Sequence, residues 1–350
     1  MYKRRKTKKV FFGDVPVGGN SPISVQSMTN TRTSDIKTTV EQINRLEKLG
    51  CEIIRTAVPD MESARAIKQI KKGINIPIVA DIHFDHKLAL ESVKSGVDAL
   101  RINPGNIGEE NKIKKVAEAC QKANIPIRVG SNSGSIEKSI LKKYDGPTAE
   151  AMVESALQNV RVLEDNNFFD IVISLKSTSI FTTLEAYSLM AKKVDYPFHI
   201  GITEAGTPWR GTIKSSAGIG ALLSAGLGDT LRVSLTAEPE EEVRVGWQIL
   251  KSLKLRKKGV EIISCPSCGR TEIDLIPLAE QIEKYTAHID KNLTIAVMGC
   301  AVNGPGEARE ADIGIAGGKQ EGLIFKKGKV IKKVPEKKLL EELLKEIENI

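Results

Sequence analysis

Eight short segments rich in β-branched residues alternate with longer amphipathic segments between residues 23 and 252, and this alternation restricts the fold more than any other feature of the sequence. We expect strands at Ile23–Met28, Ile53–Thr56, Ile78–Asp81, Ala99–Ile102, Ile125–Val129, Asp170–Leu175, His199–Thr203 and Thr230–Leu235. The pattern predicts helices at Ser34–Leu49, with Ser34 as the cap, and at Met61–Lys72, His86–Lys94, Glu109–Ala123, Thr148–Asp165, Phe181–Lys193, Thr212–Ala225 and Pro239–Leu253. Eight successive strand–helix units are typical of a closed, TIM-type (β/α)8 barrel.

The alternation stops at a charged stretch, residues 254–259, which reads as a linker. A chain of 350 residues also exceeds the size at which a single core usually stops growing. We therefore expect a barrel domain over residues 1–253 and a smaller α/β domain over 254–350. The smaller domain is expected to contain, in order, a strand Val260–Ile263, a helix Leu275–Tyr285, strands Thr294–Met298 and Asp312–Ala316, a hairpin over Gly322–Val334 and a helix from Glu336.

The net charge of +8 suggests a nucleic-acid partner, but most of it lies in one short arm. Without Lys3, Arg4, Arg5, Lys6, Lys8 and Lys9 the balance falls to +2, and an aromatic content of 4% offers few stacking surfaces for bases. We expect the arm to be a solvated terminus, and neither nucleic acid nor membrane to be a partner. No apolar run approaches the ~18 residues that span a bilayer, and no secretory signal is apparent, so we expect a cytoplasmic protein.

Cations end five of the expected strands: Arg55, Arg101, Arg128, Lys176 and Arg232. In a barrel these positions share one mouth, where the cations would repel one another unless an anion joined them. Arginine forks match phosphate oxygens, so the pattern predicts a ligand with more than one negative charge. Polar residues at the same ends are candidates for the remaining site: Asp81, His83, Asn103, Ser131, Asn132, Thr203, Glu204 and Ser234. Glu204 could be a counter-ion or a proton donor.

Three cysteines follow two expected strands of the smaller domain, with Cys265 and Cys268 in a CxxC loop and Cys300 after the next strand. Such thiols suit zinc, an iron–sulfur cluster or dithiol exchange. Zinc would need a fourth ligand, for which His288 is the nearby candidate, and dithiol exchange leaves Cys300 unexplained. Three thiolates leave one iron of a four-iron cluster open, and Glu307 could reach it or could be a solvated loop residue. Cys51 and Cys120 are expected to be packing residues.

Eight segments together carry a family resemblance: Val25–Thr31, Asp81–Phe84, Arg101–Asn106, Arg128–Asn132, Ser174–Ser177, Gly201–Pro239, Ser264–Arg270 and Met298–Gly318. In their order and spacing the chain resembles the 4-hydroxy-3-methylbut-2-enyl diphosphate synthases of the methylerythritol phosphate route to isoprenoids, in their two-domain bacterial form. The resemblance implies reductive ring opening of 2-C-methyl-D-erythritol 2,4-cyclodiphosphate, with two electrons passing singly through a 4Fe-4S cluster. Ferredoxin or flavodoxin would be the donor, and a head-to-tail homodimer would place the cluster domain of one chain over the barrel mouth of the other.

The resemblance also implies a role for each candidate residue. The cluster would be held by Cys265, Cys268, Cys300 and an exchangeable Glu307, and Glu204 would deliver a proton, with Asp81, His83 and Asn303 as possible helpers. The five cations would clamp the diphosphate, with Asn132 and Ser234 beside them and Asn103, Ser131 and Thr203 among the binding residues. Two alternatives remain at this point: a zinc-stabilised RNA-binding protein that uses the basic arm, and a pterin- or phosphosugar-binding barrel with a merely structural cluster.

Overall fold

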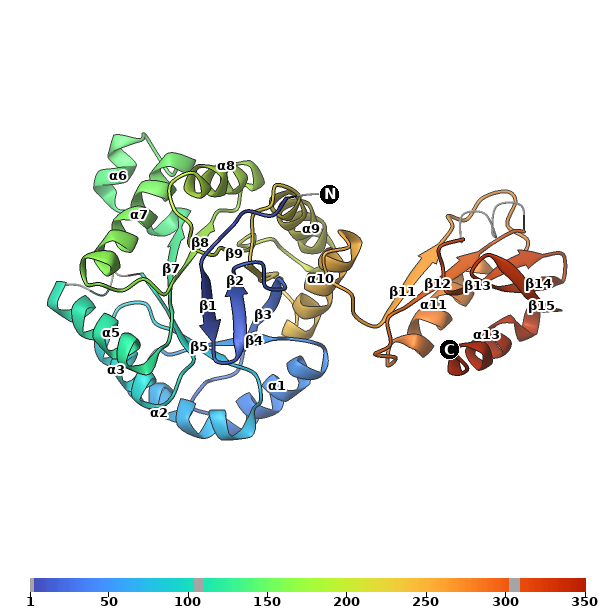
Figure 1. The fold of residues 1–350 in the computed structure, drawn as a ribbon, viewed down its shortest axis with the longest axis horizontal. Coiled ribbons are helices and arrows are strands. Elements are labelled where there is room, and N and C mark those ends of the chain that lie inside the picture. Colours follow the sequence, from blue (N-terminus) through green and yellow to red (C-terminus); the bar gives the residue numbers. More distant parts are fainter. Residues whose placement is uncertain (1–2, 104–106, 108–109, 302–308) are drawn as a thin grey trace. The chain divides into compact units, whose positions relative to one another are not determined.

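The chain divides into two compact units, Met1–Arg256 and Lys257–Ile350, each with its own sheet (Figure 1). The computed structural model describes residues 3–103, 107, 110–301 and 309–350. The sequence had placed the division after residue 253. No helix in these described ranges is both long and apolar enough to cross a bilayer.

The first unit is built on a parallel sheet that curls into a barrel. Its described strands are β3 (Ser24–Met28), β4 (Ile53–Ala57), β5 (Ile78–Asp81), β6 (Ala99–Ile102), β7 (Ile127–Asn132), β8 (Ile171–Lys176), β9 (His199–Ile200) and β10 (Thr230–Leu231). They pair in the order β8-β7-β6-β5-β4-β3-β10-β9, and a parallel bridge between Ile173 and Phe198 joins the two ends. The predicted barrel is confirmed, although β9 and β10 end earlier than the sequence pattern suggested.

Helices surround this barrel (Figure 1). They are α1 (Ile36–Lys48), α2 (Met61–Ile70) with η1 (Lys71–Gly73), α3 (His86–Lys94), α5 (Glu110–Ala123), η2 (Ser133–Ser135), α6 (Lys138–Lys143), α7 (Ala149–Asp165), α8 (Ile180–Ala191), α9 (Pro208–Ser224) and α10 (Pro239–Ser252). The expected Ser34 cap is wrong, because the Asp35 carboxylate accepts the hydrogen bond from Thr38 N that caps α1. The short α6 was not predicted.

Strand alternation decides which side chains enter the barrel. On β7, Ile127 and Val129 belong to the large apolar cluster shared with the surrounding helices, so Arg128 between them faces inward. The same alternation places Arg101 inward between Leu100 and Ile102 on β6. The barrel therefore buries its apolar residues mainly against the helices and keeps polar residues inside at its carboxyl end.

A hairpin closes the amino end of the barrel. Its strands β1 (Lys9–Phe12) and β2 (Val15–Gly18) pair antiparallel, and the hairpin was not predicted. Val10, Phe12 and Val17 pack in a cluster with the inward residues Ile53, Val79, Ala99 and Val172, which lie near the amino ends of their strands. The hairpin is thus an apolar plug for the amino end.

The basic arm before the hairpin is docked on the barrel, so its expected role as a solvated terminus is wrong. Arg4 forms an ion pair with Asp229 at 2.8 Å. Arg5 donates from Nη1 to Val194 O at 2.6 Å, and its guanidinium carbon lies 3.8 Å from the centre of the Phe198 ring. Burial lowers the pKa of Arg5, partly offset by Asp229 and Asp195. The charged side chains of Arg4 and Arg5 therefore bind to the barrel.

The second unit is a mixed sheet with helices packed against it. Its described elements are β11 (Val260–Ser264), α11 (Leu275–Thr286), β12 (Leu293–Met298), β13 (Ile313–Gly318), β14 (Glu321–Lys326), β15 (Lys329–Pro335), η3 (Glu336–Lys338) and α13 (Leu339–Glu348). Strands β11, β12 and β13 are parallel, and β13-β14-β15 form an antiparallel meander. The prediction of a smaller α/β domain after the barrel is confirmed. Because β11 and β12 are neighbours, the loops that follow them leave the same edge of the sheet.

Candidate functional site

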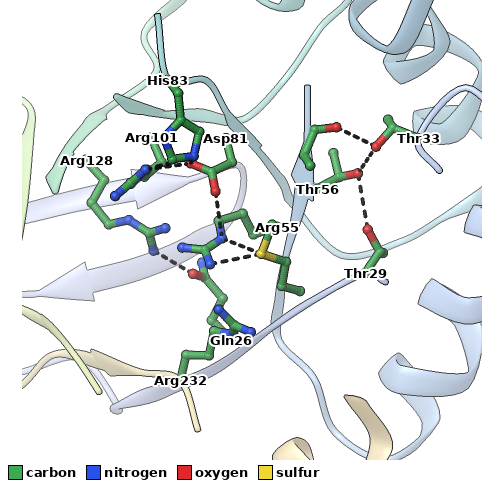
Figure 2. A network of polar contacts seen from close by, with 12 residues as sticks. Gln26, Thr29, Thr33, Arg55, Thr56, Asp81, His83, Arg101, Arg128 and Arg232 are labelled. Atoms are coloured by element: carbon green, nitrogen blue, oxygen red, sulfur yellow. Dashed lines mark hydrogen bonds and ion pairs between the residues drawn. The ribbon is translucent and has the colours of Figure 1, made fainter. Parts of the chain in front are cut away.

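The cations predicted at the strand ends converge at the carboxyl end of the barrel, and Figure 2 shows the four arginines among them. They come from β4, β6, β7 and β8 and from the residue after β10: Arg55, Arg101, Arg128, Lys176 and Arg232. Arg128 is 1% exposed, Arg55, Arg101 and Lys176 are buried, and the Arg232 side chain is 16% exposed. We call these five residues the cation ring.

One carboxylate organises the first side of the ring. Asp81 Oδ1 accepts from Arg101 Nη1 at 3.1 Å, and Asp81 Oδ2 lies 3.6 Å from Arg55 Nε (Figure 2). His83 Nε2 lies 3.3 Å from the same Arg101 Nη1. The same histidine nitrogen lies 3.7 Å from Asp81 Oδ1, so His83 contacts both members of the Arg101–Asp81 pair. Asp81 is thus an orienting group for two cations.

Neutral acceptors contact Arg128 and Arg55, and a second carboxylate pairs with Arg232. Arg128 Nη1 donates to Gln26 Oε1 at 2.5 Å, and Arg55 Nη2 lies 2.9 Å from Met28 Sδ. Arg232 Nε lies 3.5 Å from Glu242 Oε2. Among the described residues, Arg128 Nε and Nη2 are buried without a hydrogen-bond partner. The ring therefore keeps donor capacity that the protein itself does not use.

The electrostatics of the ring favour an anion. Five cations share this end of the barrel with two buried carboxylates, Asp81 and Glu242, which leaves three positive charges in excess before the exposed Glu204 is counted. Burial, together with Arg232 and Arg101, lowers the pKa of Arg55 to about 9 against the opposing effect of Asp81. Burial and the neighbouring arginines also lower the pKa values of Arg128 and Lys176. A bound polyanion would relieve this repulsion.

Asp81 is ionised in this environment. Burial alone would raise its pKa, but Arg55, the hydrogen bond with His83, Arg101 and Arg128 outweigh burial and hold the pKa below its usual range. A carboxylate in this state accepts hydrogen bonds and has no proton to deliver at neutral pH. Its part as a helper in proton transfer stays a prediction, and in the described structure Asp81 orients Arg55 and Arg101.

The remaining predicted residues are divided between the mouth and the helix layer. Asn103 follows β6 and is buried, Asn132 ends β7, and Thr203 and Ser234 are half-buried after β9 and β10. Glu204 is exposed and has a φ of 51°, a left-handed conformation that is uncommon for glutamate. Ser131 does not join this group, because its hydroxyl lies 3.4 Å from Ser155 Oγ on α7, between sheet and helix.

Four residues that the sequence did not single out complete the ring's surroundings: Gln26, Met28, Gly130 and Glu242. Gln26 and Met28 alternate inward on β3. The strand period predicts that they face the barrel interior, but it does not show that they contact the cations. A Cβ on Gly130 would lie 2.8 Å from Arg101 Nε and Nη2, so the absent side chain makes room for that guanidinium. Glu242 is one of three consecutive glutamates at the start of α10, and nothing in the sequence distinguishes it from the others.

The thiols of the second unit lie on the loops after β11 and β12. Cys265 Sγ accepts from Gly299 N at 3.1 Å, which places this sulfur beside the backbone that leads into Cys300. Cys268 is exposed. Hydrogen bonds to its thiol from the Arg270 backbone and, secondly, the Arg270 side chain lower the pKa of that thiol. A lowered pKa favours the thiolate, the form that binds metals. The donor chemistry of this edge therefore fits an iron–sulfur cluster.

The three cysteines do not form a metal site within the described part of the chain. Over the described ranges, no three His, Cys, Asp or Glu side chains lie close enough to hold a metal ion. The predicted ligand Glu307 and the predicted helper Asn303 lie outside the described residues. Cys51 and Cys120 are buried in the barrel core, as predicted, and burial raises the pKa of Cys51 to about 12.

Comparisons with known proteins match both units. The GcpE TIM-barrel domain matches residues 7–247, and the GcpE protein C-terminal domain matches residues 261–349. The chain is 63% identical to the 4-hydroxy-3-methylbut-2-en-1-yl diphosphate synthase (flavodoxin) of Caldanaerobacter subterraneus subsp. tengcongensis, over 100% of this chain and 99% of that one. It is 60% identical to the protein of the same name from Clostridium acetobutylicum, over 99% of this chain and 100% of that one.

Among solved structures, the truncated form of 3-deoxy-D-arabino-heptulosonate 7-phosphate synthase from Thermotoga maritima is similar to the barrel. It matches with a TM-score of 0.50 and 11% identity over 71% of this chain and 91% of that one. At this identity the likeness concerns the fold alone.

Proposed function

The chain belongs to the GcpE family, and from this premise we propose that it is a flavodoxin-dependent 4-hydroxy-3-methylbut-2-en-1-yl diphosphate synthase. The reaction takes 2-C-methyl-D-erythritol 2,4-cyclodiphosphate, two electrons and two protons. It opens the ring at a carbon–oxygen bond and releases one oxygen as water. The observation that supports this function is the cation ring, because its excess of three positive charges matches a diphosphate.

The ring would bind the diphosphate and orient the carbon skeleton. Arg55 and Arg101 are held by Asp81, and Arg128 by Gln26, so each can present its free donors without a large loss of side-chain entropy on binding. Lys176 adds a compact charge from β8. Asn103, Asn132, Thr203 and Ser234 follow neighbouring strands, and we assign them to the remaining polar contacts with the substrate.

Glu204 is the proposed proton donor. It lies in the loop after β9, at the carboxyl end of the barrel, and is exposed in the isolated chain. The adjacent loops support each other, because Thr236 N donates to Gly206 O at 2.9 Å. An acid at this position can protonate the oxygen that leaves as water. His83, beside Arg101, remains a candidate for a supporting hydrogen bond.

The family is an iron–sulfur enzyme family, and in this chain Cys265, Cys268 and Cys300 would hold the cluster. Glu307 would be the fourth, replaceable ligand. When bound, a 4Fe-4S cluster supplies the two electrons one at a time. Gly299 N, which donates to Cys265 Sγ, would stabilise negative charge on that sulfur.

The partners follow from this chemistry. Flavodoxin is the proposed donor because the relatives carry it in their names. A head-to-tail homodimer would bring the cluster domain of one chain to the barrel of the other, and a cytoplasmic location suits oxygen-sensitive thiolate ligands. The RNA-binding alternative is not supported, since Arg4 and Arg5 of the basic arm are engaged with the barrel.

Iron and sulfide analysis of anaerobically purified protein, combined with turnover of the cyclodiphosphate by reduced flavodoxin, tests the proposal. We expect about four irons and four sulfides per chain, and a diphosphate product lacking one oxygen. The Cys300→Ser variant should lose turnover, whereas Cys120→Ser should keep it. A colourless protein containing zinc, or an iron-loaded protein that leaves the cyclodiphosphate intact, would contradict the proposal.

A further inference from the structure

The carboxylate of Glu242 joins three parts of the barrel near the ring. Its Oε1 accepts from Leu235 N at 2.9 Å. Its Oε2 accepts from Ser27 Oγ at 3.4 Å and lies 3.5 Å from Arg232 Nε. Glu242 is only 5% exposed. One buried carboxylate thus contacts β3, the guanidinium of Arg232 and the backbone of the loop that carries Arg232 and Ser234.

The other acids at the start of α10 show that helix-end electrostatics do not explain this burial. Acids are favourable in the first turn of any helix, where they face the positive end of the helix dipole. Glu241 meets this description, since it is 45% exposed and pairs with Arg244 on the same helix. Glu240 pairs with Arg45 on α1. Among these three glutamates, Glu242 alone contacts a ring cation.

Arg232 is paired with Glu242 by charge, because its Nε is buried and has no hydrogen-bond partner among the described residues. Arg55 and Arg101 share the Asp81 carboxylate. Arg55 also contacts the Met28 sulfur, and the Arg101 guanidinium packs against Gly130. Arg232 follows β10, a strand of only two residues, so few strand–strand hydrogen bonds hold the backbone near it. Leu235 and Thr236 tie the same loop to Glu242 and to Gly206.

We propose that Glu242 is a positioning residue that holds Arg232 and its loop in the geometry that grips the substrate's diphosphate. The inference rests on the proposed function and extends it to a residue that does not itself touch the substrate. Electrostatics and positioning predict opposite results here. Removing a negative charge from the site should strengthen anion binding if charge alone matters, and should weaken it if Glu242 sets the geometry.

The test uses the anaerobically purified, cluster-loaded full chain and inorganic diphosphate as the probe, measured by calorimetry. We expect Glu242→Gln to raise the dissociation constant about tenfold, within the range for residues that share one network. The matched control Glu241→Gln should leave it unchanged. In turnover, Glu242→Gln should raise KM with kcat within about twofold, the pattern of lost ground-state anchoring.

A double-mutant cycle with Arg232→Gln identifies the route. If Glu242 acts through Arg232, adding Glu242→Gln to the Arg232→Gln variant should change the dissociation constant by less than about twofold. Full additivity of the two effects, or unchanged or tighter binding in Glu242→Gln, would overturn the proposal. If Glu242→Gln is insoluble, Glu242→Asp keeps the charge and withdraws it by one methylene, and normal diphosphate binding by that variant would also overturn it. Failure of the wild-type chain to bind diphosphate would instead count against the proposed function.

Discussion

Gly130 on β7 controls the position of a ring cation through the side chain that it lacks. In Gly130→Ala the new Cβ would lie 2.8 Å from Arg101 Nε and Nη2, and Arg101 is buried and tied to Asp81, so the guanidinium must move off its partner. We expect KM for the cyclodiphosphate to rise about tenfold, a loss of ~1.4 kcal/mol in anchoring. Steady-state kinetics measure this change. Gly220→Ala is the control, because a Cβ at Gly220 on α9 meets no atom within 4 Å, and normal kinetics in both variants would refute the role of Gly130.

His199 gives the free energy of unfolding a specific pH dependence. The ring is fully buried, its two nitrogens have no partner among the described residues, and burial with the nearby cations lowers its pKa well below the usual value. The native state thus leaves His199 neutral while the unfolded chain takes up a proton below pH ~6.5, so stability falls as the pH drops through that value. The contribution is about 1.4 kcal/mol per pH unit below the unfolded pKa.

Urea unfolding between pH 5 and 7.5 checks this expectation. His199→Asn should flatten the slope between pH 5 and 6.5. His288→Asn, at a histidine of the second unit, should keep the slope. An unchanged slope in His199→Asn would show that other groups carry the pH dependence.

At the scale of single residues, the sequence predicted the cations of the site better than their supports. Arg101 and Arg128 were predicted near strand ends, and although Arg128 is the second residue of the longer β7, strand period plus charge is enough to place both inside the barrel. Glu242 cannot be recognised this way, because its contact with Arg232 depends on how α10 docks against β3 and β10. Ser131 was predicted at the barrel mouth because it lies next to Asn132. Adjacent strand residues point to opposite faces of the sheet, and Ser131 faces Ser155 on the helix side.

At the scale of elements, the hairpin β1–β2 is the part with the clearest energetic consequence. Phe12 is fully buried in an apolar cluster with the inward residues at the barrel's amino end. Phe12→Ala should lower the free energy of unfolding by about 3–5 kcal/mol, because it leaves a cavity in the plug. Phe11→Ala is a matched control at the preceding residue, which is 52% exposed, and should change the free energy of unfolding little. Chemical denaturation measures both, and equal effects would refute the plug.

Three elements of the barrel match the sequence prediction residue for residue. Strands β5 and β6 and helix α3 begin and end at the predicted residues. The hairpin was missed because it directly follows a highly charged arm, although its strands are as long as β5 and β6. Strands β9 and β10 were predicted too long, since apolar residues after them, such as Ile202 and Val233, are buried beside α9 and α10 without belonging to the strand ladder.

At the scale of the whole molecule, the two units have separate apolar cores, and the proposed activities divide between them. The cation ring belongs entirely to the barrel, and the three cysteine ligands belong to the second unit. Thiolate ligands bind the cluster only when that unit is folded, so the cluster stabilises the second unit by linkage. The barrel should not share this stabilisation in the isolated chain.

Removal of the cluster tests this independence. Both tryptophans of the chain, Trp209 and Trp247, lie in the barrel unit, so tryptophan fluorescence during urea unfolding reports on the barrel, while far-ultraviolet circular dichroism reports on both units. After iron is chelated anaerobically, we expect an earlier transition in circular dichroism and an unchanged tryptophan midpoint. The dissociation constant for inorganic diphosphate should change by less than about twofold, because every cation that we assign to the diphosphate lies in the barrel. A shift of the tryptophan midpoint together with weaker diphosphate binding would show instead that the cluster domain supports the barrel's site.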